Sequence, residues 1–180
     1  MQNIKFSKAK IYFTLAISIA IWALLVYDFL HNGVPSHHIL NKKDLPEISN
    51  WWGGILLPIL SYLVFSRIEN RDNLKKETLS KLPKQVSIGF VVALIMSILI
   101  STFFTYDHAD IPFYLLVSIL VSSIFYPIYK AECLLGFVIG MTFTFGAVLP
   151  TGIGSILAII GFMIYKVIRL GLLFLKRSIL

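Results

Sequence analysis

Charged residues are scarce in this chain of 180 residues, where they make up 14% of the sequence. Soluble domains commonly contain about 25% of such residues, so this composition argues against an ordinary soluble fold. Hydrophobic residues reach 57%, and several apolar runs approach the length that spans a bilayer. The sequence therefore predicts an all-α, polytopic integral membrane protein with a single transmembrane domain over residues 1–180.

Cysteines, acidic residues and familiar motifs are also few. The one cysteine, Cys133, has no partner for an internal disulfide. No GxxxxGK[ST], GxGxxG, GxSxG, HExxH or CxxC motif is present, which argues against the familiar nucleotide-binding, hydrolase and zinc-protease sites. The net charge of +7 has no basic patch beyond what membrane topology requires. We therefore expect membrane lipids as partners and no nucleic acid.

Six apolar runs predict six transmembrane helices in one bundle. Lipid cannot satisfy a free backbone N–H or C=O group, so each crossing must be helical. The first run is too long for the apolar part of a signal peptide and is interpreted as a retained span. A Gly-rich stretch, residues 150–154, predicts the turn before the last span. The predicted spans are approximately 11–30, 51–68, 85–105, 112–129, 131–149 and 152–174.

Basic residues are distributed unevenly between the connections. With six spans, 14 of the 16 Lys and Arg residues fall on one side, and only Lys42 and Lys43 fall on the other. Lys and Arg concentrate on the cytoplasmic side of membrane proteins. The sequence thus predicts a multi-pass protein of a cell (inner) membrane with both termini cytoplasmic, an N-in/C-in arrangement.

All four histidines fall in the first and third connections, on the predicted outer side. Asp28 and His31 are three residues apart and share a face of the first helix, and the third connection adds Asp107 and His108. A carboxylate that orients an imidazole can create a general base. These four residues are therefore the predicted catalytic residues of an enzyme.

The same connections also predict a metal site. Three histidines and a carboxylate suit zinc, or another divalent metal, with an open coordination position. Adjacent His37 and His38 can face one centre only on an irregular backbone, so the alternative is an ordinary interfacial loop. The predicted ligands are His31, His37, His38, His108 and Asp110.

Three classes of function follow from these patterns. The first is an enzyme acting at the outer leaflet on a lipid or lipid-linked substrate. The second is a small transporter or substrate-binding subunit, which needs a polar cavity reaching the midplane. The third is a non-catalytic assembly protein that forms a homo- or hetero-oligomer through Gly136 and Gly140, although such glycine pairs also serve simple helix packing. Glu132, at the start of the fifth span, complements the helix dipole.

Overall fold

Six α-helices account for most of the part of the chain that the computed structural model describes, which comprises residues 2–31, 33–38, 44, 46–73, 84–107 and 110–179. A short hairpin and a 3-10 helix, η2 (Asn50–Trp52), lie between the first two helices. The all-α prediction is confirmed apart from this hairpin. The helices are α1 (Gln2–His31), α2 (Gly53–Asn73), α3 (Lys84–Thr105), α4 (Asp110–Ser122), α5 (Ala131–Phe145) and α6 (Val148–Ile179), and the strands are β1 (Ser36–His38) and β2 (Glu47–Ser49).

Four helical segments are long and apolar enough to cross a membrane. They cover Lys8–His31, Asn50–Arg71, Lys84–Thr105 and Val148–Gly171. The remaining two helices, α4 and α5, have 13 and 15 residues and are shorter than a typical span. The structure is therefore compatible with a membrane location, and the count of six crossings stays a prediction.

Two predicted boundaries near α4 and α6 are wrong. The predicted span 112–129 ends as a helix at Ser122, where the hydroxyls of Ser122 and Ser123 donate to the carbonyls of Ile119 and Leu120. Such bonds compete with the helical ladder, and Pro127 prevents the helix from resuming at once.

The predicted turn at residues 150–154 lies inside α6 instead. The chain turns earlier, at Gly146, whose φ of 68° favours glycine. Pro150 falls in the first turn of α6, where a missing N–H leaves no helical bond unmade.

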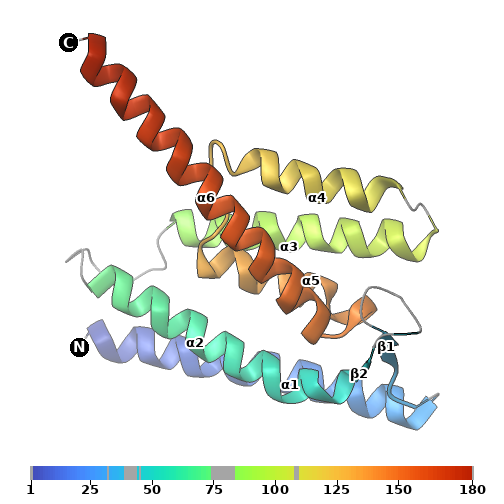
Figure 1. The fold of residues 1–180 in the computed structure, drawn as a ribbon. Helices are drawn as coiled ribbons and strands as arrows, with labels where there is room; N and C mark the ends of the chain where they lie inside the picture. Colours follow the sequence, from blue (N-terminus) through green and yellow to red (C-terminus); the bar gives the residue numbers. More distant parts are fainter. Residues whose placement is uncertain are drawn as a thin grey trace.

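Helix α5 lies at the centre of the packing. Figure 1 shows α1 and α2 as an antiparallel pair, α3 and α4 as neighbours, and α6 crossing α5 before running away from the other helices. Helix α5 packs against α2, α3 and α6. Its Leu135 joins a buried cluster with α2 and α3, and its Val138 joins another with α1 and α2. The helix with the greatest role in the core is thus one of the shortest.

Small residues allow α3 and α5 to pack closely side by side. A Cβ atom added at Gly136 would overlap the carbonyl oxygen of Phe90, and one added at Gly140 would overlap the Ser97 hydroxyl. The Ser97 hydroxyl is shared between the Leu94 carbonyl at 2.9 Å and the Gly136 carbonyl at 3.3 Å, and that of Ser101 donates to the Gly140 carbonyl at 3.5 Å. The glycine pair therefore serves a contact within the chain, and an oligomer formed through the same face would have to displace α3.

Candidate functional site

The described parts of the predicted outer connections lie at one end of the bundle, here called the hairpin end and defined by β1, β2 and the end of α3. The two strands pair antiparallel, with Ser36 opposite Ser49. A Cβ atom at Gly146 would overlap the Asn50 side chain, so the turn between α5 and α6 touches the segment that follows β2. The ring of Phe104 lies 4.7 Å from that of Phe145, which brings the end of α3 to the same end.

The histidine in the last turn of α1 interacts with its own helix. His31 Nδ1 lies 2.9 Å from the Tyr27 carbonyl oxygen, and the two rings stack with centroids 4.1 Å apart. His31 is exposed and Asp28 is half-buried. Both residues are described, and no hydrogen bond or ion pair joins them. In this structure the carboxylate therefore does not orient the imidazole as the spacing suggested.

The hairpin places the next two histidines in a short regular strand. His37 pairs with Ile48, and its Nε2 atom is buried without a hydrogen-bond partner among the described residues. His38 occupies the next position, opposite Glu47, whose carboxylate accepts a hydrogen bond from the Ser36 hydroxyl. The irregular backbone that would let adjacent histidines share one metal is absent from β1.

The third connection is described only in part. Asp107 is exposed and has a φ of 63°, a conformation that aspartate tolerates better than most residues. Asp110 is exposed in the first turn of α4, and His108 lies outside the described residues. Among the residues that the structure does describe, no three His, Cys, Asp or Glu side chains are grouped to hold a metal. The catalytic and zinc sites therefore stay predictions.

An ion pair with a buried carboxylate lies at the opposite end of the bundle. We call this the basic end, defined by the last turns of α2, the first turns of α3 and the start of α5. Arg71 Nη1 on α2 lies 3.2 Å from both carboxylate oxygens of Glu132 on α5. The Glu132 side chain is 1% exposed, whereas that of Arg71 is 32% exposed. Burial of a carboxylate is costly, so removal of Arg71 alone would leave Glu132 as an unpaired buried charge.

Glycine at position 89 lets the polar groups of this end pack against α3. A Cβ atom there would lie 2.6 Å from the Tyr126 hydroxyl, 3.1 Å from Cys133 Sγ and 3.5 Å from Glu132 Cγ. Glu132 is therefore level with Gly89, which lies about 7 Å along α3 from its first residue, Lys84. The carboxylate is thus inside the helical bundle rather than at its rim.

The connection between α4 and α5 contributes the Tyr126 phenol. Its hydroxyl donates a hydrogen bond to the Gln85 carbonyl oxygen at 3.0 Å. This bond ties the connection between α4 and α5 to the first turn of α3.

A second ion pair joins α2 to α1 at the basic end. Lys10 Nζ lies 3.1 Å from Glu69 Oε2 and 3.5 Å from the Ser66 hydroxyl, and it sits 4.8 Å from the centre of the Tyr62 ring. The last turns of α2 are therefore tied to α1 through Glu69 and to α5 through Arg71.

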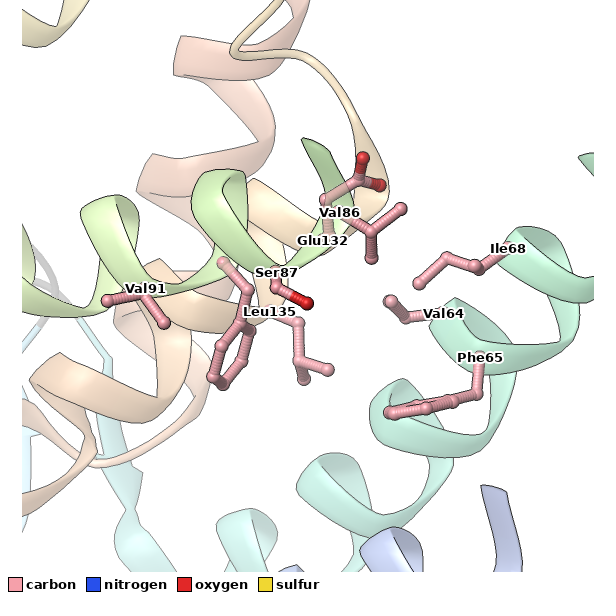
Figure 2. Close-up of a pocket in the computed structure, with 9 residues that line it drawn as sticks. Val64, Phe65, Ile68, Val86, Ser87, Val91, Glu132 and Leu135 are labelled. Carbon is pink, nitrogen blue, oxygen red and sulfur yellow. The ribbon is translucent and has the colours of Figure 1, made fainter. Parts of the chain in front are cut away.

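An apolar crevice lies between α2 on one side and α3 and α5 on the other. Its volume is about 210 Å³, and apolar atoms line nearly all of it. Figure 2 shows the α2 side chains facing those of α3 and α5 across this space, with Glu132 at one end. Ser87 and Val91 are exposed, so the crevice opens at the surface of the bundle. The lining residues are Val64, Phe65, Ile68, Val86, Ser87, Phe90, Val91, Glu132 and Leu135.

Sequence reasoning missed this site. In the sequence, Arg71 is one of many basic residues that determine topology. The presence of Glu132 at the start of its helix is explained by the helix dipole. The available signal is that Glu132 is the only acidic residue in the predicted span 131–149. An ionisable residue in such a segment is a functional candidate. Its partner is 61 residues away, and no local pattern identifies it.

No family model matches the sequence, and no curated protein or solved structure is significantly similar to it.

Proposed function

We propose that this chain is an integral membrane protein of a cell (inner) membrane that crosses it six times, has both termini cytoplasmic and binds a lipid at its basic end. The concentration of Lys and Arg at that end supports the orientation. Four helices are long and apolar enough to cross a membrane without flanking residues. The two shorter ones rise about 20 Å and about 22 Å, so each needs flanking residues to cross about 30 Å of hydrocarbon.

The connection between α4 and α5 supports the two shorter crossings. Irregular backbone is tolerated at membrane depth only where its polar groups are satisfied. The N–H groups of Ser123, Ile124, Phe125 and Tyr126 all bond to carbonyls within residues 120–122, and that of Lys130 bonds to the Pro127 carbonyl. This connection can therefore extend α4 and α5 toward the cytoplasmic interface.

The observation that carries lipid binding is the crevice that ends at Glu132, whose carboxylate pairs with Arg71. Its apolar lining suits an acyl chain rather than a hydrated solute, so it favours a lipid ligand over the polar path of a transporter. A charged pair lies at one end of the crevice, where the headgroup of a lipid from the cytoplasmic leaflet would lie.

A tryptophan placed in the crevice tests this proposal. Ser87→Trp fills a crevice position that is already exposed, whereas Ile88→Trp places the same side chain at the neighbouring exposed position, which does not line the crevice. We expect the Ser87 variant to lose the lipid that the wild type retains in mild detergent, as measured by native mass spectrometry. The Ile88 variant should retain it. Equal retention in both variants would refute lipid binding in this crevice.

The outer connections carry a second proposal, an enzyme with a metal or acid–base site at the outer leaflet. The observation in its favour is His37, whose buried Nε2 atom has no hydrogen-bond partner in the described part of the chain. Metal analysis of the purified wild type beside His37→Ala and His108→Ala tests it. Unchanged metal content in both variants would rule out a metal held by these histidines.

A further inference from the structure

The start of α6 lies level with two exposed tryptophans. The turn at Gly146 touches Asn50, and Trp51 and Trp52 follow directly in η2. Tryptophan concentrates where hydrocarbon meets headgroups, because its ring is apolar and its N–H group needs a polar partner. With the membrane location and orientation proposed above, the first turn of α6 therefore lies at the outer edge of the hydrocarbon.

Two exposed cations lie about one membrane thickness further along this helix. Lys166 and Arg169 follow Val148 after helical rises of about 27 Å and about 32 Å. The hydrocarbon of a bilayer is about 30 Å thick. Both cations therefore lie close to the level of the phosphates of the cytoplasmic leaflet. An inclination of α6 shifts them toward the hydrocarbon, and their long side chains can still reach the headgroups.

Aromatic rings hold both cations on the membrane side of their own backbone. Lys166 Nζ lies 5.3 Å from the centre of the Phe162 ring. The Arg169 guanidinium carbon lies 5.1 Å from the centre of the Tyr165 ring. Each ring belongs to the preceding helical turn, which is nearer the membrane centre. The Tyr129 ring packs against both of these rings from the connection between α4 and α5, with centroids 5.1 Å and 5.7 Å away.

Acidic side chains are missing from this part of the sequence. The chain contains no Asp or Glu after Glu132. Within the part of the chain that the structure describes, the ion pairs involve Lys10 and Arg71, and neither Lys166 nor Arg169 takes part in one. Figure 1 shows this end of α6 running away from the other helices. The two cations are therefore accessible to an anion from outside the described bundle.

Exposed apolar side chains lie within one turn of the two cations. They are Met163, Val167 and Leu170. A surface that is both cationic and apolar suits an anionic membrane better than a hydrophilic polyanion, because the lipid supplies phosphates and acyl chains together.

We propose that Lys166 and Arg169 bind anionic phospholipid headgroups of the cytoplasmic leaflet. Their cations contact the lipid phosphates, and the apolar side chains beside them contact the upper parts of the acyl chains. Anionic lipids therefore gather around this part of α6. The inference rests on the proposed membrane location and orientation and does not depend on a lipid in the crevice.

A fluorescent label at Val167 tests which lipids gather there. Val167→Cys in a Cys133→Ala background carries the label, and the full-length protein is reconstituted in vesicles with equal amounts of phosphatidylglycerol and phosphatidylcholine. Brominated acyl chains are placed on one lipid and then on the other, so the two degrees of quenching give the local lipid ratio. We expect about a fivefold excess of phosphatidylglycerol, the ratio expected for a basic residue near a membrane surface.

Charge variants of the labelled protein identify the residues responsible. Lys166→Gln/Arg169→Gln removes both cations and should leave the two lipids in equal amounts. The matched control Arg67→Gln/Lys84→Gln removes two exposed basic residues from α2 and α3 at the basic end and should keep the excess. The exchange Lys166→Arg/Arg169→Lys retains both charges and should keep it too. An excess that survives without the two cations, or that the control or the exchange abolishes, would overturn the proposal.

A second label separates this inference from the membrane location itself. Ile98→Cys in the same background places the label at an exposed position of α3 toward the hairpin end, where we expect no excess of either lipid. An equal excess at both labels would refute a local site on α6. If lipids quench the label at Ile98 but not at Val167, something other than lipid, such as a second copy, covers α6 and the inference fails. If lipids quench neither label, the proposed membrane location is wrong.

Discussion

Replacement of Gly136 by alanine should destabilise the bundle. The added methyl group would overlap the Phe90 carbonyl oxygen and lie 3.2 Å from the Leu94 backbone nitrogen. Both neighbours are backbone atoms of α3, so no side-chain rotation relieves the contact. Helices α3 and α5 must move apart, and the Ser97 hydroxyl then loses its bond to the Gly136 carbonyl.

The magnitude follows from opposing contributions. Overpacking of this kind costs about 1–3 kcal/mol, and loss of the hydrogen bond adds about 0.6 kcal/mol in a membrane interior. Alanine recovers about 0.8 kcal/mol of helix propensity. We expect a net loss of about 2 kcal/mol, which corresponds to a melting temperature lower by about 4–8 °C for a chain of this size.

The matched control is Gly152→Ala in α6, where an added Cβ atom meets nothing within 4 Å. This variant gains helix propensity without a contact and should melt at or slightly above the wild-type temperature. Thermal unfolding of the detergent-solubilised proteins measures both. Equal melting temperatures for the Gly136 and Gly152 variants would refute the close α3–α5 contact. A lower melting temperature for Gly136→Ala would also mean that the loss of an oligomer in a Gly136 variant can follow from destabilisation of the bundle. Such a loss would then not show that Gly136 contacts a second copy of the chain.

Three more predictions concern the ion pair, the turn at Gly146 and the topology. Arg71→Met should lower the free energy of unfolding by about 3 kcal/mol because it leaves a buried carboxylate unpaired. Glu132→Leu should lower it by under about 1 kcal/mol because Arg71 reaches solvent. Equal losses in chemical denaturation would contradict this asymmetry. Gly146→Ala should lower the melting temperature by about 2–8 °C, since φ is 68° and the new methyl group meets Asn50; a melting temperature equal to that of Gly152→Ala would refute it. Reporter enzymes fused to either terminus should show activity in the cytoplasm and none outside the membrane. Activity of either fusion outside would exclude the N-in/C-in arrangement.

The helical segments were readable from sequence to different degrees. The predicted spans 11–30, 51–68 and 85–105 lie within the helical segments that begin at Gln2, Asn50 and Lys84. Local hydrophobicity suffices there because each run is long and uninterrupted. Around α4 and α6 the local signals misled, because Pro150 sits harmlessly in a first turn and serine hydroxyls help to end a helix within an apolar run.

The candidate sites show the same division. The sequence indicated that Asp28, His31 and Asp107 gather at one end of the bundle, and all three lie there in the structure. It did not show that His31 turns back to Tyr27 instead of pairing with Asp28. Spacing along a helix says which residues can meet, but the conformation of the side chain decides which partner it takes.

By itself, the sequence determined an all-α, strongly apolar chain with its basic residues unevenly distributed, because composition and the length of apolar runs are properties of single segments. Only the tertiary structure decided that α5 occupies the centre, that Gly136 packs against Phe90, and that Glu132 pairs with Arg71. These contacts depend on which helices become neighbours and how far each is rotated. Neither quantity is encoded in the periodicity or charge of any one segment, so the site at the basic end emerges only when the helices pack.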